Sequence, residues 1–579
     1  MIETHYILAP YSMLLPAISI LLATIITIMA FRKLYPKPYP GIPYNEASAN
    51  RAAGDIPDLV PIIQETKEYS NSIFTVTTQK LGTPIAQFLF PAIRKPLIVL
   101  EDPREIEDII VRRNKEFDKA PMALDIFSPM FPKASISQYT TPELRSQKRV
   151  WADVMSAEFL RKTAAPNIYN ATLDLLDLWR LKATTVYKDK PFHVLEDLKN
   201  AALDAIWVAI VGDKPGITRY ETRKLKRQLD SPQSDSDEST LLRGTFIKEE
   251  VTYISQTIAR NSNSPVPKWA QKLETYTPRY RKFRATVTAE ISKAMKDAVD
   301  RFQRLESGSL EPGDIDTCMM DLVLRRQVVE AKKAGKDASD PVKDQNMLDE
   351  MFVMLVGGHD STANTLTWFV RFMEAYPAVQ DHLRSTLLDA FPGPDLPSVE
   401  DILGTDIPYL DAACEESMRL AGTAKANLRQ AIVDTEILGC KVPKGAEIFM
   451  NYHINRPPAA VDELKHSKSS QSANAKRGEG FQGRAGLHLH LFEPERWLEK
   501  SQETGKEKFN AYALPQLAFG GGYRGCSGRK LATMEFRIIV VLLIMNLEFL
   551  ELPEEFKTPR AIERIFREPE TPYVKLRVL

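Results

Sequence analysis

A glycine-rich loop near the C-terminus carries the strongest chemical signal of the sequence. The segment Phe519-Gly-Gly-Gly-Tyr-Arg-Gly-Cys-Ser-Gly528 places Cys526 just before a helical pattern that begins at Arg529. Backbone N–H groups and the positive end of a helix favour a thiolate, so this position predicts a lowered pKa for Cys526. Glycines let a flat, bulky cofactor approach the main chain, and Arg524 offers a donor fork that suits a carboxylate. Together these residues predict an iron–thiolate bond with a carboxylate of the cofactor nearby.

The same glycines also spell the dinucleotide fingerprint G-x-G-x-x-G, at Gly520, Gly522 and Gly525. A dinucleotide site needs a preceding strand, a βαβ unit and an acidic residue about 20 positions further on. Here the helical pattern runs into the apolar stretch 538–543 and the chain ends soon afterwards, so this interpretation is disfavoured.

A second polar group interrupts a long apolar helical pattern in the middle of the chain. Gly357 and Gly358 lie inside it, although each glycine costs roughly 1 kcal/mol relative to alanine in a helix. Asp360, Ser361 and Thr362 follow, and hydroxyls at such positions can bond back to the helix and open it locally. The pattern predicts a distorted helix that delivers protons beside a cavity. The alternative is a close helix crossing at the glycines, with the polar groups satisfied.

Two short charged patterns lie between these segments. Glu416 and Arg419 share one face of a helix that Asp406 is expected to cap and Gly422 to end. Such a pair is usually exposed and contributes little to stability. The second pattern is the turn Pro494-Glu-Arg-Trp497.

Taken in this order, the patterns resemble the cytochrome P450 family of haem-thiolate monooxygenases. The cysteine loop matches F-x-x-G-x-R-x-C-x-G, and Gly357–Thr362 resembles the oxygen-activating motif [AG]-G-x-[DE]-T-[TS]. Glu416 and Arg419 match its E-x-x-R pair, and residues 494–497 match its P-E-R-[FW] turn. The resemblance extends from about Pro40 to the C-terminus. It implies the fold of that family, mainly α with a smaller β portion.

The resemblance also implies a role for each candidate residue. Haem b would be held through its iron by the Cys526 thiolate. The other loop residues that would contact the cofactor are Phe519, Gly522, Arg524 and Gly528. The residues that would relay protons to dioxygen are Asp360, Ser361 and Thr362. The residues that would form a buried, stabilising charge cluster are Glu416, Arg419 and Arg496.

The sequence departs from the family pattern at two places. The usual threonine of the oxygen-activating helix is Ser361, which keeps the hydroxyl but loses rotamer control by the methyl group. The W-x-x-x-R helix of the family has no tryptophan here, since Leu144 and Lys148 occupy that spacing. Either Lys148 or Arg149 is expected to reach a haem propionate, and Arg429 is a further candidate.

These residues require a mainly helical body to position them. Helical patterns dominate from about 142 to 418, while β-type runs occur at 73–77, at 96–100 and between 428 and 450. We therefore predict one large catalytic domain over 49–579, with a β portion drawn from both ends of the chain. Asp102 and Pro103 look like a helix start, and the polar stretch 465–486 is interpreted as a surface insertion.

The N-terminus predicts where the protein resides. Residues 11–31 form an uncharged, apolar run long enough to cross a bilayer, and basic residues follow it directly. A cleaved signal peptide would have its basic residues on the other side. We expect a single-span anchor in the endoplasmic reticulum membrane, with a cytosolic catalytic domain joined by a proline-rich hinge at 32–48.

Composition excludes several classes of protein. Hydrophobic residues make up 44% and charged residues 26% of the 579, which excludes a disordered chain. The formal net charge of +0 argues against an extended nucleic-acid surface. The 4 cysteines are too sparse for a disulfide framework.

We expect a monooxygenase that inserts one oxygen atom from O2 into an apolar small molecule, in the manner of fungal enzymes of secondary metabolism. The resemblance implies an NADPH-cytochrome P450 reductase as electron source, with cytochrome b5 as a second donor and membrane lipid as surroundings. One alternative is a haem-dependent isomerase, dehydratase or ring-forming enzyme without net oxygen insertion. Another is a non-enzymatic, membrane-tethered haem sensor.

Overall fold

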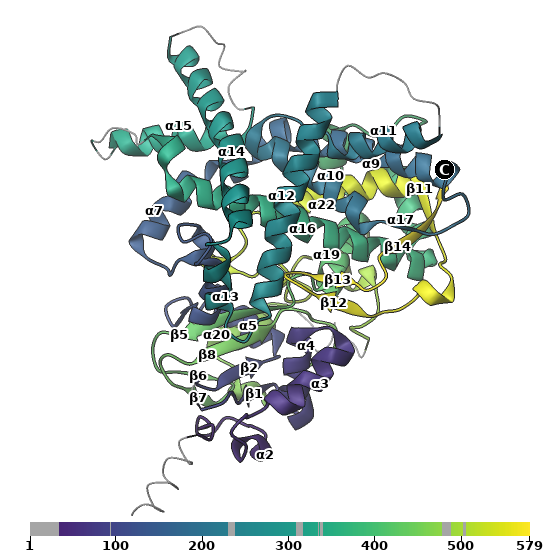
Figure 1. Cartoon of the computed structure of the whole chain (residues 1–579). Coiled ribbons are helices and arrows are strands. Elements are labelled where there is room, and N and C mark those ends of the chain that lie inside the picture. The colour runs from purple at the N-terminus through teal and green to yellow at the C-terminus, as the bar shows by residue number, and fades with distance from the viewer. Residues whose placement is uncertain are drawn as a thin grey trace, which may run out of the picture.

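The computed structural model describes residues 34–579 except 93, 230–237, 308–316, 334, 336–339, 478–487 and 502–504. Helices form most of this part, and a sheet with its flanking short helices lies at one end, toward the bottom of Figure 1. The mainly α architecture with a smaller β portion is therefore confirmed. The predicted anchor at 11–31 lies outside the described residues. Within them, no helix is both long enough and apolar enough for a membrane span.

The longest helices span the middle of the chain, as the sequence predicts, and one follows near the C-terminus. They are α9 (Ala165–Thr184), α10 (Leu195–Val211), α11 (Ile217–Leu229), α12 (Glu238–Ser262), α14 (Pro278–Glu306), α15 (Met319–Lys333), α16 (Gln345–Ala375), α17 (Pro377–Ala390), α19 (Pro408–Ala421) and α22 (Arg529–Asn546). Shorter helices are α2 (Glu46–Ala49), α3 (Ile56–Thr66), α4 (Tyr69–Phe74), α5 (Pro103–Val111), α6 (Pro121–Phe127), α7 (Pro142–Val150), α8 (Ala157–Phe159), α13 (Pro267–Glu274), α18 (Val399–Gly404) and α20 (Lys468–Ala475).

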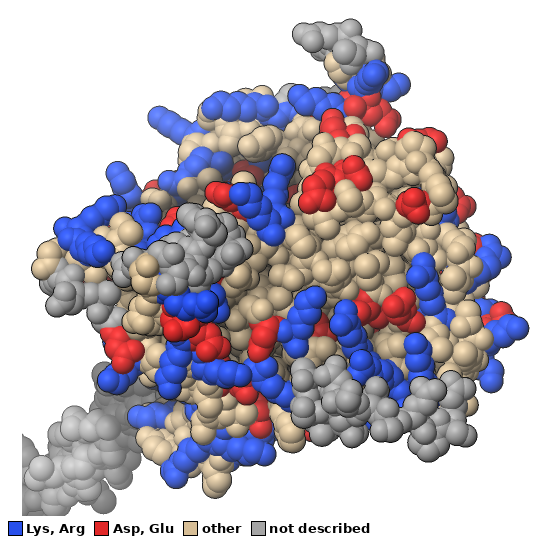
Figure 2. All heavy atoms as spheres, turned by 90° about the horizontal axis from the view of Figure 1, so that it is seen from above, with Lys and Arg blue, Asp and Glu red and all other residues tan. Residues whose placement is uncertain are grey.

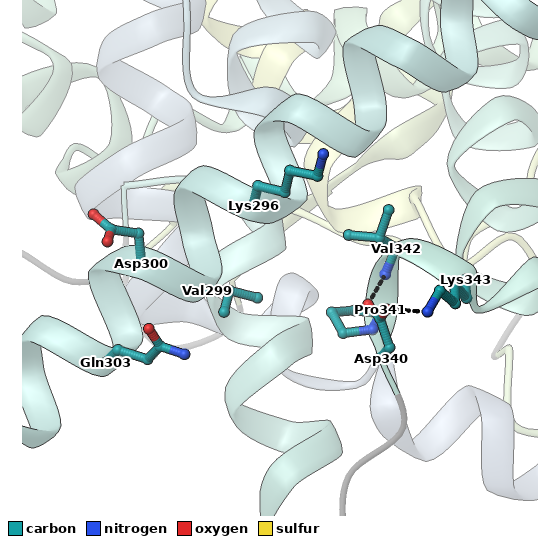
Figure 3. A pocket seen from close by; sticks show the side chains of 8 residues that line it. All are labelled: Lys296, Val299, Asp300, Gln303, Asp340, Pro341, Val342 and Lys343. Atoms are coloured by element: carbon teal, nitrogen blue, oxygen red, sulfur yellow. Dashed lines mark hydrogen bonds and ion pairs between the residues drawn. The ribbon is translucent and has the colours of Figure 1, made fainter.

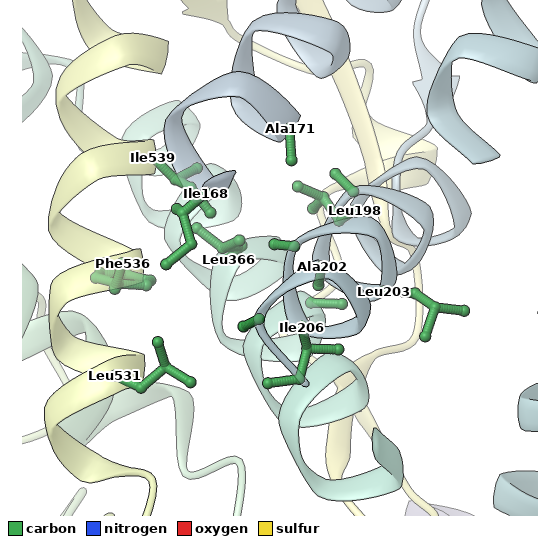
Figure 4. Packing of buried hydrophobic residues seen from close by; sticks show 14 of the residues in the cluster. Ile168, Ala171, Leu198, Ala202, Leu203, Ile206, Leu366, Leu531, Phe536 and Ile539 are labelled. Carbon is green, nitrogen blue, oxygen red and sulfur yellow. The ribbon is translucent and has the colours of Figure 1, made fainter. Parts of the chain in front are cut away.

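Four helices, α9, α10, α16 and α22, pack around the centre of the molecule. Figure 4 shows apolar side chains from all four pointing into one cluster. Those labelled are Ile168 and Ala171 from α9, Leu198, Ala202, Leu203 and Ile206 from α10, Leu366 from α16, and Leu531, Phe536 and Ile539 from α22. Each fully buried side chain of this size contributes about 1.5–3 kcal/mol. The cluster therefore fixes α16 rigidly against the helix that follows the cysteine loop.

The main sheet combines strands from both ends of the chain, as predicted. Its order is β1 (Ile85–Phe88), β2 (Leu97–Leu100), β8 (Glu447–Asn451), β5 (Ala426–Ala431) and β3 (Phe117–Lys119). Only the β2–β8 pair is parallel, with Leu97 opposite Glu447. A second sheet has the strand order β11 (Leu547–Leu550), β14 (Tyr573–Val578) and β4 (Phe192–His193). Three further sheets are two-stranded hairpins: β6–β7 (Thr435–Ile437, Cys440–Val442), β9–β10 (Leu498–Lys500, Glu507–Phe509) and β12–β13 (Ala561–Glu563, Arg567–Pro569).

The predicted strand at 73–77 is wrong. This segment is helical and continues from α4 into a π-helical turn over Thr75–Gln79. Its threonine hydroxyls donate to carbonyls four residues earlier, Thr77 to Ile73 at 2.6 Å and Thr75 to Asn71 at 2.9 Å. These side-chain bonds and burial of the apolar residues override the strand preference of a β-branched run.

The predicted helix ends are confirmed at α5 and in part at α19. Asp102 accepts a bond from the backbone N–H of Glu105 at the start of α5. α19 begins without a side-chain cap, so the prediction for Asp406 is wrong. Gly422 ends α19 at φ 54°, where a side chain would collide with the His453 ring.

Part of the predicted insertion at 465–486 is ordered against α5. Ser467 and Ser469 donate to Asp108 at 2.6 and 2.8 Å, and α20 follows directly. Arg477 pairs with Glu107 at 2.5 Å. The insertion is thus fastened to the middle of α5, and its residues 478–486 lie outside the described part.

Charged side chains of both signs are scattered over the face drawn in Figure 2. Figure 2 looks onto the side at the top of Figure 1, where Lys and Arg side chains lie around the edge with Asp and Glu side chains among them. No continuous field of one sign covers this face.

Candidate functional site

The cysteine loop turns the chain back on itself in front of α22. The backbone N–H of Cys526 donates to the carbonyl of Phe519 at 2.8 Å, which closes the loop. Gly528 is the residue before α22, and a side chain there would lie 3.8 Å from the Cys526 sulfur. The Cys526 side chain keeps accessible surface although its loop packs against the interior.

Gly522 shows why this loop is rich in glycine. Its φ of 60° lies in the left-handed region, and a Cβ atom would stand 2.4 Å from the carbonyl oxygen of Ile110 in α5. A Cβ on Gly521 would stand 2.6 Å from Val111. The last turn of α5 therefore acts as the template against which the loop is shaped.

The predicted direction of the Cys526 pKa shift is wrong. Burial raises the pKa of this thiol. The N–H groups of Gly528 and Arg529 and the charge of Lys148 act in the opposite direction, as the sequence suggests, but they do not outweigh burial. The backbone donors around the sulfur are thus present as expected, and the protein alone does not make it an acidic thiol.

Four cations gather beside the cysteine loop without a carboxylate partner in the described part of the chain. They donate to main-chain carbonyls instead: Lys148 to Tyr523 at 2.7 Å, Arg524 to Gln138 at 2.6 Å, Arg429 to Leu428 at 3.1 Å, and Lys119 to Ile136. Burial, together with the charges of Arg524, Arg429 and Lys148, holds the pKa of Lys119 well below its usual value. The nearby carboxylate of Asp118 accepts bonds from Thr140 at 2.8 and 2.7 Å.

Unpaired, partly buried cations are costly, so this group is built for an anion that the protein chain does not supply. A haem carries two carboxylates at one edge, and a thiolate ligand for its iron lies on the same loop as Arg524. The donor set therefore fits a haem held by Cys526, with Lys119, Lys148, Arg429 and Arg524 around its carboxylates. We call these four residues the cation group.

The structure distinguishes the two alternatives for α7. Lys148 lies against the Tyr523 ring and bonds to the cysteine loop, whereas Arg149 is exposed. Leu144, which stands where the family has tryptophan, is fully buried.

One stripe of α16 remains accessible in the middle of the molecule. Between residues 347 and 370 every side chain is buried except six, which recur every three or four residues: Val353, Met354, Gly357, Gly358, Ser361 and Thr365. This spacing places them on one face of the helix. On one side of the stripe Thr362 bonds to α22, the helix that starts just after Cys526. We infer that the stripe and the cysteine loop face the same interior space, and we call this face the α16 stripe.

The two glycines of α16 do different things, and both interpretations from the sequence hold in part. A Cβ on Gly357 would meet nothing within 4 Å, so this residue opens onto the space. A Cβ on Gly358 would stand 2.8 Å from Ile206, so this residue permits the close crossing with α10. The expected distortion is absent, because α16 is one continuous α-helix of 31 residues.

Of the three predicted proton-relay residues, only Ser361 lies on the α16 stripe. Its hydroxyl donates to the Gly357 carbonyl at 2.6 Å. Asp360 is buried on one flank, 3.3 Å from the Lys199 ammonium of α10. Thr362 is buried on the other flank and donates to Glu535 of α22 at 3.2 Å.

The E-x-x-R pair and the P-E-R-W turn form one buried cluster, as expected. Glu416 accepts from Arg419 at 2.6 and 2.8 Å and from Arg496 at 2.9 Å. Burial acts to raise the Glu416 pKa, but Arg419, Arg496 and Trp497 outweigh it and the pKa is lowered. Arg496 also pairs with Glu493 at 2.6 Å, so two cations face two anions.

Sequence reasoning missed three residues of these sites. Lys119 sits in no motif, and Lys199 pairs with Asp360 from a distant helix. Glu535 is fully buried on α22, where burial raises its pKa to about 8. The only feature of the sequence that places Glu535 near the site is its position on the predicted helix that starts at Arg529, nine residues after Cys526.

A surface pocket elsewhere carries none of this chemistry. A cavity of about 480 Å³ lies between α14 and the turn Pro341–Lys343 (Figure 3). Lys296, Val299, Asp300 and Gln303 line it from α14, and neither a cysteine nor a histidine is among its lining residues.

Comparison with known proteins agrees with the arrangement around Cys526. A sequence model of the family described as Cytochrome P450 matches residues 56–458 and 490–576. The cytochrome P450 monooxygenase GME11363 of Pestalotiopsis microspora is 30% identical, over 96% of this chain and 97% of the relative. The cytochrome P450 monooxygenase TRI13 of Fusarium sporotrichioides is 28% identical, over 96% of this chain and 98% of the relative. A crystal structure of a cytochrome P450, 17% identical, superposes with a TM-score of 0.64 over 94% of this chain and 100% of that one, which shows the same fold.

Proposed function

Because the chain belongs to the cytochrome P450 family of haem-dependent monooxygenases, we propose that it is a membrane-anchored member that oxidises a small, largely apolar molecule of secondary metabolism. Haem bound through a thiolate supplies activation of O2, with one oxygen atom going to the substrate and the other to water at the expense of two electrons from NADPH. The observation that carries the proposal is the cation group beside Cys526, next to the α16 stripe.

Different residues bind the cofactor, line the substrate space and hold a proton in this proposal. Lys119, Lys148, Arg429 and Arg524 bind the carboxylate edge of the cofactor, and Cys526 supplies the sulfur ligand. The α16 stripe forms one wall of the substrate space. Ser361 holds a proton at Oγ that now goes to the Gly357 carbonyl, and rotation about χ1 turns it toward the space.

Asp360 and Lys199 form the inner end of a proton path toward Ser361 in this proposal. Their ion pair of 3.3 Å joins α10 to α16 beside the stripe. Such a path fits a reaction that consumes protons when O2 is reduced.

Membrane attachment is supported by the predicted anchor and by the surface of α13. Four large apolar side chains are 55–66% exposed there: Val266, Trp269, Leu273 and Tyr276. Trp269 and Leu273, four residues apart, lie on one face of α13, and Val266 and Tyr276 lie just before and just after the helix. Exposed Trp, Leu and Tyr beside lysines is the composition of a helix that lies in a membrane interface.

Electron delivery is proposed to come from a separate NADPH reductase, with cytochrome b5 as a second donor. Arg529 and Lys530 are exposed at the start of α22, close to Cys526, and offer basic contacts for an acidic partner. The fungal relatives, both named cytochrome P450 monooxygenases, support a fungal-type enzyme, and its place in secondary metabolism is part of the proposal.

The decisive test is the carbon monoxide difference spectrum of the reduced protein. Cys526→Ala is expected to abolish the thiolate-type band, whereas Cys440→Ala, in the distant hairpin β6–β7, should leave it unchanged. An unchanged band in Cys526→Ala would refute the assignment. Turnover that requires neither O2 nor NADPH would favour an isomerase or dehydratase instead.

A further inference from the structure

Two threonine hydroxyls meet at the end of the α16 stripe. Thr365 is its last accessible residue, and Thr423 lies in the connection between α19 and β5. Their Oγ1 atoms are 2.8 Å apart, and both side chains are only partly buried. Two segments 58 residues apart thus place a polar pair one helical turn from Ser361. The other end of the α16 stripe is apolar, at Val353 and Met354.

The direction of each hydrogen bond in the pair follows from proton accounting. The Thr365 hydroxyl lies 2.9 Å from the Ser361 carbonyl, which can only accept, so the single proton of Thr365 is used there. The bond between the two hydroxyls must then use the proton of Thr423. Both protons are committed, and what remains is unshared electron pairs on the two oxygens. In this arrangement the pair can accept a hydrogen bond from a ligand at no cost, whereas donating to a ligand would require one hydroxyl to give up a bond that it already makes.

The hydroxyl of Thr423 is not needed to hold its own loop in place. The Thr423 carbonyl already accepts from the backbone N–H of Arg567 in β13 at 3.0 Å. The Arg567 guanidinium also donates to the Ala421 carbonyl at 2.8 Å, just before the connection. Arg567 thus fixes the main chain at Ala421 and Thr423, and the backbone N–H of Tyr452 bonds to the Lys425 carbonyl at 2.8 Å beyond it, so the loop does not depend on the Thr423 hydroxyl for its path.

We propose that Thr365 and Thr423 recognise a hydroxyl group of the substrate, so the substrate is an apolar alcohol. This inference rests on the proposed function. An alcohol donates its proton to the threonine pair, while a ketone, an ether or a hydrocarbon has no proton to offer. Anchoring the hydroxyl here places it one turn, about 5.4 Å, along α16 from Ser361, so the carbon that is oxidised is a different one. The enzyme then acts after a step that has already installed an oxygen atom.

The test compares three probes of nearly equal size, cyclododecanol, cyclododecanone and cyclododecane, bound to the haem-loaded protein. Binding is followed by the shift of the haem absorption band, which needs no turnover. In the unaltered protein we expect the alcohol to bind about fivefold more tightly than the ketone, the value of one net hydrogen bond. The quantity compared between variants is this ratio, which removes differences in hydrophobicity between proteins.

The double variant Thr365→Val/Thr423→Val removes both hydroxyl acceptors at nearly constant shape and should bring the ratio close to one. Thr423→Ser keeps the hydroxyl and should retain the ratio. The matched control is Thr367→Val, which removes a fully buried hydroxyl from the same helix, off the stripe, where it bonds to Ala363 at 2.7 Å.

Several outcomes would overturn the inference: no binding of the alcohol, a ratio near one in the unaltered protein, or a ratio unchanged in the double variant Thr365→Val/Thr423→Val. Each protein is first checked by its reduced carbon monoxide spectrum. A normal thiolate spectrum without alcohol preference defeats only this inference. Loss of the thiolate spectrum from the unaltered protein defeats the proposed function itself.

Discussion

Two buried charge clusters of this protein differ in how their charges are balanced. Around Glu416, each arginine has a carboxylate and each carboxylate oxygen has a donor, including the Trp497 indole at 2.8 Å. In the cation group, four positive side chains lie together and bond only to neutral oxygens in the described part of the chain. The first cluster is complete within the protein, and the second is completed by a ligand.

The difference shows how the same residue type serves stability in one place and binding in another. A buried ion pair with all donors satisfied holds its segments together, and its loss exposes uncompensated charge. An unbalanced group lowers the stability of the protein alone and recovers that energy when an anion binds. Altering single members should therefore have opposite consequences in the two clusters.

The largest effect is expected from Glu416→Ala. This change leaves Arg419 and Arg496 buried without their shared carboxylate, so the free energy of unfolding should fall by about 3–5 kcal/mol. Urea denaturation followed by circular dichroism measures it. Glu495→Ala, in the same turn, is the control: its exposed carboxylate accepts one bond, from the Tyr409 hydroxyl at 3.1 Å, so it should cost only about 1 kcal/mol. Equal losses in both variants would contradict the comparison.

Glu535 provides the reverse case, a buried acid without a cation. Its pKa of about 8, against a usual 4.5, means that the folded protein keeps a proton that the unfolded chain has lost between those pH values. Stability should therefore fall as pH rises through this window. Glu535→Gln should remove that fall, on the order of a few kcal/mol between pH 5 and 8. Denaturation at both pH values measures it, with the exposed Glu555→Gln as control.

Removing one member of the cation group should weaken cofactor binding without harming the fold. Lys148→Met is expected to release haem to apomyoglobin about tenfold faster, because one charge-assisted bond is lost. The unfolding free energy of the haem-free protein should stay the same or rise, because repulsion with Arg524 is relieved. Arg149→Met, one residue along and exposed, should change neither quantity. A drop in stability with normal haem retention would assign Lys148 to the fold instead.

The smallest effect is expected from Trp497→Phe. It removes one N–H bond to the Glu416 carboxylate and leaves the ion pairs intact, so stability should fall by about 1–2 kcal/mol. Haem release, measured in the same transfer assay, should be unaffected. Faster release here would show that the balanced cluster also shapes the cofactor site.

Residues within continuous motifs could be predicted from the sequence, and residues joined only by the fold could not. The pairing of Glu416 with Arg419 follows from their helical spacing. The close approach of the cysteine loop to other backbone follows from the number of glycines in that loop. Lys119 could not be found, because its partners Arg429, Lys148 and Arg524 come from three other segments. No local pattern marks a lysine that burial and distant charges perturb.

The sequence also could not predict the outcome where two opposing effects act on the same residue. The helix start beside Cys526 predicts a lowered pKa, and only the structure shows that burial outweighs it. Likewise the β-branched run at 73–77 favours a strand, but hydroxyl bonds to the helix backbone reverse the preference. In both places the local preference exists, and burial in the folded protein acts against it.

One helix links the surface insertion to the sulfur. Ser467, Ser469 and Arg477 bond to the middle of α5, at Glu107 and Asp108. The last turn of the same helix leaves no room for side chains at Gly521 and Gly522. A close-packed interior transmits displacement. A displacement of this surface segment is therefore transmitted through α5 to the loop that holds the Cys526 sulfur.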